Sequence, residues 1–137
     1  MNGLRRATVR LRVPFCDVDS LQVVWHGNYL KYFDCAREAL FDEAGLDLSK
    51  MYADHRIAFP VTRSQVKHVK PLRFRDEFDC CARVTELGCR IVIDFEIHLV
   101  DGGTLCARGQ TEQVAVQLPD GTLELSLPDF VQRALGG

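Results

Sequence analysis

Hydrophobic and polar positions alternate along residues 7–15 of the chain. One side of this segment carries Ala7, Val9, Leu11, Val13 and Phe15, and the other carries Thr8, Arg10, Arg12 and Pro14. A period of two places apolar side chains on one face of a strand. The pattern therefore predicts a half-buried strand, and a polar loop follows it.

Residues 29–44 instead repeat their apolar positions at three-to-four spacing. The polar positions that fall on the remaining face are Lys31, Asp34, Glu38 and Asp42. This spacing predicts a helix that is packed on several sides. Asn28 is the predicted N-cap, and Gly45 is the predicted stop.

The rest of the chain is typical of strands. A short helical turn is expected at 47–50, and strands are expected at 57–70, with a bend near Pro60, and at 77–87, 91–100 and 104–118. Gly88 and the Asp101-Gly102-Gly103 run supply turns between them. The predicted order is one strand, one long helix and four strands.

One antiparallel sheet and a single apolar helix predict an α+β fold in which the sheet curls around the helix, since both elements must bury an apolar face. Val92, Val100 and either Val114 or Val116 would lie on the opposite sheet face. That face could associate with another subunit or could meet water. Residues 1–137 contain no repeat or linker, so we expect a single domain.

Composition narrows the class of protein. The chain has 137 residues, of which 47% are hydrophobic and 26% charged, and its net charge is −2. These values are typical of a globular domain and give no general attraction to nucleic acid or anionic lipid. Neither a membrane span nor a signal peptide is recognisable, so a cytoplasmic location is expected.

Six cysteines are scattered through apolar segments without a Cys-x-x-Cys pair, and the four histidines lack the spacing of metal ligands. We expect reduced, mostly buried thiols. We expect no metal site and no cofactor.

Residues 17–29 carry the most distinctive chemistry. They place Asp17, Asp19 and His26 in a loop that enters the long helix. A carboxylate beside a helix N-terminus is suited to attack on a carbonyl and to stabilising the negative charge that develops. Asp19 could equally be a turn or capping residue.

The chain resembles the hot-dog-fold acyl-CoA thioesterases of the 4-hydroxybenzoyl-CoA thioesterase type. The resemblance lies in Asp17-Val18-Asp19, in the run from Val23 to Tyr29, and in Tyr32, Ala36-Arg37 and Gly45. It implies a sheet wrapped around one helix, an acyl-CoA substrate, and homodimers or homotetramers with active sites between subunits. Asp19 matches the catalytic aspartate of the family, which would attack the thioester or activate water.

The resemblance also implies the surroundings of Asp19. Backbone N–H groups around His26 and Gly27 would stabilise the oxyanion, and Gly27 would allow close approach of the substrate. His26 could position water or substrate, or it could be structural.

The remaining candidates would bind the substrate. Trp25, Tyr29, Phe59 and Val61 could line the acyl pocket, although each could simply be a packing residue. Basic residues would bind the phosphates of coenzyme A, although surface bases are common. Arg73 and Arg90 are selected from a candidate set that also contains Arg63, Lys67, Lys70 and Arg75.

The loop departs from the family pattern at Ser20-Leu21-Gln22, where many relatives have a small residue and a glycine. The change alters the backbone angles open to the loop that carries Asp19. Two alternatives follow: a non-catalytic acyl-CoA binding or scaffold protein, and a hydratase or dehydratase of enoyl thioesters. The second would normally use a helix histidine, and the helix has none.

Overall fold

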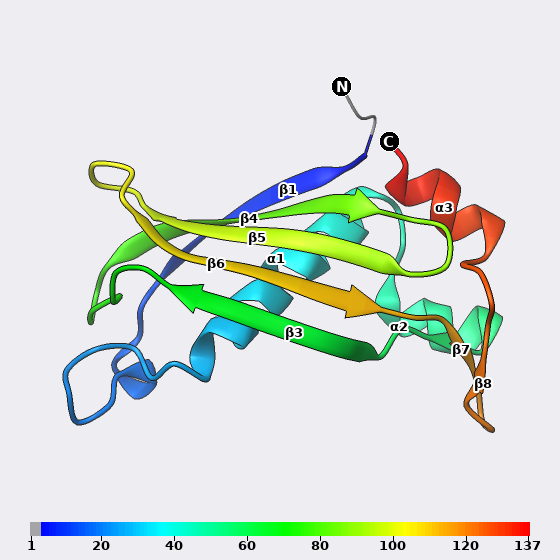
Figure 1. Cartoon of the computed structure of the whole chain (residues 1–137), viewed down its shortest axis with the longest axis horizontal. Helices are drawn as coiled ribbons and strands as arrows, with labels where there is room; N and C mark the ends of the chain where they lie inside the picture. The colour runs from blue at the N-terminus through cyan, green and yellow to red at the C-terminus, as the bar shows by residue number, and fades with distance from the viewer. Residues whose placement is uncertain (1–3) are drawn as a thin grey trace.

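A five-stranded antiparallel sheet wraps around one long helix in the computed structural model, which describes residues 4–137 (Figure 1). The strand order is β1-β4-β5-β6-β3. The elements are β1 (Arg6–Arg12), α1 (Asn28–Glu43), β3 (Val61–His68), β4 (Glu77–Glu86), β5 (Ile91–Leu99) and β6 (Leu105–Gln113). The predicted α+β arrangement is confirmed.

Smaller elements cover one end of this layer. These elements are α2 (Leu48–Lys50), β2 (Ile57–Ala58), β7 (Val116–Gln117), β8 (Thr122–Leu123) and α3 (Asp129–Leu135). The three short strands form a second sheet with the order β2-β7-β8. A 3-10 turn spans Phe15–Asp17, and a π-helical turn spans Met51–His55. The predicted turn at 47–50 is confirmed, whereas β8 and α3 were not predicted.

Helix α1 lies very close to the sheet at Gly109. The Phe33 ring stacks on Phe95 with centroids 4.5 Å apart. A Cβ at Gly109 would come within 2.1 Å of the Phe33 ring. The helix can therefore approach β6 only because this position has no side chain.

The start of α1 differs from the prediction. Asn28 is the first helical residue rather than the N-cap, and the capping position falls on Gly27 without a side-chain hydrogen bond. The Asn28 amide donates instead to the backbone oxygen of Asp17 at 3.0 Å. The predicted stop is confirmed, since Gly45 has a left-handed φ of 80° directly after the helix.

Three predicted strands end earlier than expected. The first ends at Arg12, and Phe15 is 74% exposed in the 3-10 turn. The strand predicted at 57–70 divides into β2 and β3, so the bend near Pro60 is confirmed as a break. The strand predicted at 104–118 divides likewise into β6 and β7.

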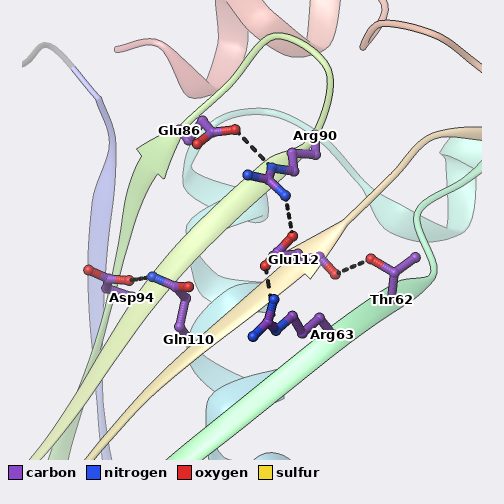
Figure 2. A network of polar contacts seen from close by, with 7 residues as sticks. All are labelled: Thr62, Arg63, Glu86, Arg90, Asp94, Gln110 and Glu112. Carbon is purple, nitrogen blue, oxygen red and sulfur yellow. Dashed lines mark hydrogen bonds and ion pairs between the residues drawn. The ribbon is translucent and has the colours of Figure 1, made fainter.

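The sheet face turned away from α1 is largely polar, and Figure 2 shows part of it. Val92 is buried within the chain itself, so it needs no second subunit to cover it.

The expectation of mostly buried thiols is wrong. All six cysteines are free, but only two are buried, while Cys16, Cys35 and Cys89 are exposed. Among residues 4–137, no helix is both long and apolar enough to cross a bilayer.

Candidate functional site

A cavity of about 260 Å³ opens beside the start of α1. Its walls come from the loop that carries Asp19 and His26, from Tyr29 on α1, and from residues 68–71 after β3. The fold therefore brings together three of the predicted site residues. It adds Lys70, one of the basic residues considered for coenzyme A, and His68, which the sequence analysis missed because its approach depends on the long-range position of β3.

Asp19 holds a turn with one carboxylate oxygen. Its Oδ1 accepts the backbone N–H of Leu21 at 2.8 Å, and its own N–H donates to the Val23 oxygen at 3.0 Å. Within the described chain, Oδ2 has no hydrogen-bond partner. Gln22 adopts a left-handed φ of 69°, where many relatives of the resembled family have glycine nearby. Asp19 thus holds the turn and borders the cavity while one of its carboxylate oxygens has no partner in the described residues.

The backbone N–H groups at the start of α1 differ in whether they are hydrogen-bonded. The N–H of Asn28 donates to the Trp25 oxygen, and that of Tyr29 donates to the His26 oxygen. The N–H groups of His26 and Gly27 donate no hydrogen bond to any atom of residues 4–137. Such free donors are the usual feature of a helix N-terminus, where the helix dipole is also positive.

The predicted open space above Gly27 is occupied by an aromatic ring. A Cβ at Gly27 would lie 2.2 Å from the Trp25 ring, which is itself half exposed. Glycine at this position therefore lets Trp25 fold over the helix start. The predicted approach of a substrate to the Gly27 backbone stays a prediction.

Tyr29 lines the cavity and is held there by two contacts. Its hydroxyl accepts the Leu72 N–H at 3.2 Å, and its ring meets the His68 ring edge-on with centroids 4.6 Å apart. Burial raises the pKa of this tyrosine. The His26 and His68 rings lie 6.4 Å apart, so two imidazoles border the cavity.

Asp17 is buried and does not line the cavity. Its side chain is 4% exposed and accepts hydrogen bonds from Lys31 and Tyr32. Burial opposes ionisation of Asp17, but these hydrogen bonds outweigh it and lower the pKa. Burial, followed by the hydrogen bond to Asp17 and then by the Asp17 charge, raises the pKa of Tyr32.

Phe59 and Val61 do not line the Asp19 cavity of their own chain. They border a second cavity of about 420 Å³ at the start of β3, together with Arg37 of α1. The Asp19 cavity lies at the other end of this strand, beside His68. The two groups of predicted acyl-pocket residues are thus separated by the length of β3.

The predicted coenzyme A residues also divide. Arg90 lies near the far end of β6 and binds Glu86 at 2.9 Å and Glu112 at 2.5 Å (Figure 2). Its own chain therefore does not bring Arg90 to Asp19, because two carboxylates hold it at the opposite end of the sheet. Arg73 is exposed and follows Leu72, whose N–H binds Tyr29. In residues 4–137 no group of three or more His, Cys, Asp and Glu side chains could hold a metal ion.

Comparison with known proteins assigns the chain to a family. The sequence model of the thioesterase-like superfamily matches residues 13–135. The chain belongs to the thioesterase-like superfamily. The predicted thioesterase-type enzyme family is therefore confirmed.

The chain is also similar to proteins of known sequence and of known structure. The 1,4-dihydroxy-2-naphthoyl-CoA hydrolase of Thermosynechococcus vestitus is 28% identical over 108 residues, which cover 78% of this chain and 73% of that protein. The crystal structure of a 1,4-dihydroxy-2-naphthoyl-CoA thioesterase from Synechocystis matches with a TM-score of 0.88 at 24% identity, over 96% of both chains. A gentisyl-coenzyme A thioesterase structure matches with a TM-score of 0.82 at 24% identity, over 93% of this chain and 98% of that one. These likenesses confirm the predicted hot-dog fold.

Proposed function

We propose that this protein is an acyl-CoA thioesterase that hydrolyses its substrate to a carboxylic acid and coenzyme A. The observation that carries the proposal is the cavity in which Asp19 lies beside the start of α1, in a chain of the thioesterase-like superfamily. A thioester carbonyl needs an attacking oxygen on one side and hydrogen-bond donors for its own oxygen. Both kinds of group border this cavity.

Asp19 is the proposed nucleophile or general base. As a nucleophile, its free oxygen attacks the thioester carbon, the C–S bond breaks, coenzyme A leaves as the thiolate and takes a proton from water, and a second water hydrolyses the resulting anhydride. As a base, Asp19 takes a proton from the water that attacks the same carbon, the C–S bond breaks, and the proton passes to the departing thiolate. The partner-free Oδ2 supports either route, since Oδ1 already holds the turn to Leu21.

The N–H groups of His26 and Gly27 are the proposed oxyanion donors. Their support is that they make no hydrogen bond within the described residues and lie at the positive end of the α1 dipole. Loss of one such donor typically costs about 3 kcal/mol of transition-state stabilisation.

An aromatic acyl group with hydroxyl substituents is the proposed substrate. This assignment rests on relatives that act on 1,4-dihydroxy-2-naphthoyl-CoA and on gentisyl-coenzyme A. Tyr29 supplies aromatic surface in the cavity, where a flat ring can pack. The half-exposed Trp25 ring lies 5.1 Å from the ring of His26, which lines the same cavity. Lys70 at the cavity and Arg73 beyond it are the proposed partners of the coenzyme A phosphates.

A homodimer paired through β3 is the proposed assembly, and two dimers could form a tetramer. β3 is an edge strand, and seven of its eight residues are exposed. Antiparallel pairing of two such strands about a two-fold axis places the start of one beside the end of the other. Phe59 and Val61 of the partner subunit would then reach the Asp19 cavity. The acyl pocket would thus combine Tyr29 of one chain with these two residues of the other.

The test compares three forms of the protein on a panel of acyl-CoAs. The wild type should release thiol from 1,4-dihydroxy-2-naphthoyl-CoA faster than from short-chain and long-chain aliphatic acyl-CoAs. Asp19→Asn should lower kcat by about 10³-fold, because the amide is neither a base nor a nucleophile. Asp120→Asn is the matched control: Asp120 also accepts the N–H two residues further on, in the distant β7–β8 turn, and this variant should keep full activity.

Each other result leads to a different conclusion. Full activity of Asp19→Asn would remove this carboxylate from the mechanism and leave only its turn role. Tight binding of a nonhydrolysable acyl-CoA without hydrolysis of any thioester would favour the acyl-CoA binding protein instead.

A further inference from the structure

The buried carboxylate of Asp17 is the most heavily hydrogen-bonded group near the site. It accepts the Lys31 ammonium at 2.6 Å and the Tyr32 hydroxyl at 2.6 Å, one on each oxygen. The Cys16 thiol donates to it at 3.8 Å. Both Lys31 and Tyr32 belong to α1, so this carboxylate fastens the helix to the loop before it.

The backbone oxygen of Asp17 makes a second set of contacts. It accepts the Trp25 N–H at 2.9 Å and the Asn28 side-chain amide at 3.0 Å. These two donors lie directly before and after the pair His26 and Gly27. One residue therefore holds both sides of the segment that carries the proposed oxyanion donors.

Asp17 is also only two residues from Asp19. An isolated bridge between Val18 and Val24 closes the loop between Asp19 and the helix start. The chain on either side of this bridge is thus fixed relative to α1 through the Asp17 contacts. The Asp19 side chain, by contrast, is partly exposed. Within the described residues only one of its carboxylate oxygens accepts a hydrogen bond, from the N–H of Leu21.

We propose that Asp17 is a positioning residue of the active site, which sets the distance between the Asp19 carboxylate and the free N–H groups at the start of α1. The inference rests on the proposed function. Its physical basis is that a misplacement of about 1 Å can cost about 10²-fold in rate, even when substrate still binds. The two carboxylates of this motif thus have different roles. Asp17 is buried and accepts hydrogen bonds on both oxygens, and Asp19 borders the cavity.

The experiment measures kcat and KM for Asp17→Asn and Tyr32→Phe on the preferred acyl-CoA, at least 20 °C below the Tm of each variant. Asp17→Asn exchanges one acceptor oxygen for an N–H donor that faces Lys31 or Tyr32. We expect kcat to fall about 10²-fold and KM to change less than about threefold. Affinity for a nonhydrolysable acyl-CoA should follow KM.

Tyr32→Phe keeps the ring on Phe78, whose centroid is 4.9 Å away, and removes a single donor to Asp17. It should lower kcat about 5- to 10-fold with the same unchanged KM. If Asp17→Asn does not fold, Tyr32→Phe alone tests whether the Asp17 contacts position the active site.

Asp79→Asn is the matched control. Asp79 is also an ion-paired carboxylate, held by Arg10 on the sheet at 2.9 Å, which lowers its pKa. This variant should keep the wild-type kcat, since the pair lies away from the cavity.

The outcomes separate this inference from the proposed function. Wild-type kcat in a folded Tyr32→Phe and in a folded Asp17→Asn would overturn the positioning role while Asp19→Asn remains inactive. A rise in KM that matches the fall in kcat/KM would also overturn it, because the loss would then lie in binding. A wild type without thioesterase activity would instead refute the proposed function.

Discussion

Two aspartates separated by one residue have different environments in this chain. Asp17 is buried and accepts hydrogen bonds from Lys31 and Tyr32, whereas Asp19 borders the cavity with one oxygen free of partners in the described chain. The family resemblance assigned the catalytic role to Asp19, but nothing in the sequence showed that Asp17 would be buried against α1. The difference arises because the side chains of α1 reach back to the first aspartate only.

The buried aspartate should make stability depend on pH. Its pKa is lowered in the folded state, so ionised Asp17 stabilises the fold above the ordinary aspartate pKa of about 3.9, and this contribution is lost as the pH falls through the folded-state value. We expect the free energy of unfolding to fall below about pH 4 in the wild type. Urea unfolding of wild type and Asp17→Asn between pH 7 and pH 3 measures this.

The variant should be less stable at pH 7 by about 2 kcal/mol, the usual size for hydrogen bonds to a charged group. Its difference from wild type should shrink towards pH 3. A constant difference across this range would show that the charge of Asp17 does not contribute.

At the scale of elements, the hydrophobic pattern predicted the long helix and the four main strands after it correctly, but not where several of them end. Asn28 was predicted as the N-cap, yet its amide is used by the Asp17 backbone. The strand predicted at 57–70 breaks because Pro60 cannot donate to a ladder. Periodicity reports which face is buried, while element ends depend on partners distant in sequence.

The contact between α1 and β6 makes a direct prediction about packing. Gly109→Ala should destabilise the protein by about 1–3 kcal/mol, because its Cβ would overlap the Phe33 ring that stacks on Phe95. Thermal unfolding followed by circular dichroism measures the loss. Arg108→Ala, at the neighbouring exposed position of β6, should leave Tm within about 2 °C, and equal Tm values for the two variants would contradict the packing argument.

At the scale of the whole molecule, the predicted acyl-pocket residues lie at both ends of β3. Tyr29 lines the cavity by His68, and Phe59 and Val61 line the cavity by the start of the strand. A second copy paired through β3 would bring these halves together. The cytoplasmic location and the single domain stay predictions.

Subunit complementation tests the shared site. Asp19→Asn and Val61→Asp should each be nearly inactive alone, because the first lacks the carboxylate and the second places a charge in the acyl pocket of the other copy. Mixed by unfolding and refolding together, they should recover about a quarter of wild-type activity, since half of the dimers then hold one intact site of two. Light scattering should give twice the 15.5 kDa of one chain for a dimer, or four times this mass if two dimers form a tetramer.

No recovery on mixing, with a dimer mass confirmed, would show that each chain builds its own pocket. A monomer mass with full activity would contradict both the pairing through β3 and the shared site.

The sequence by itself determined the α+β class, the order of the main elements and the motif that carries Asp19, His26 and Gly27. Periodicity and local chemistry are sufficient for these, since each depends on neighbours within a few residues. The tertiary structure alone decided that Trp25 covers Gly27, that His68 and Lys70 reach the cavity, and that Phe59, Val61 and Arg90 lie away from it. These outcomes depend on how strands distant in sequence pair, and strand pairing fixes which side chains share a cavity.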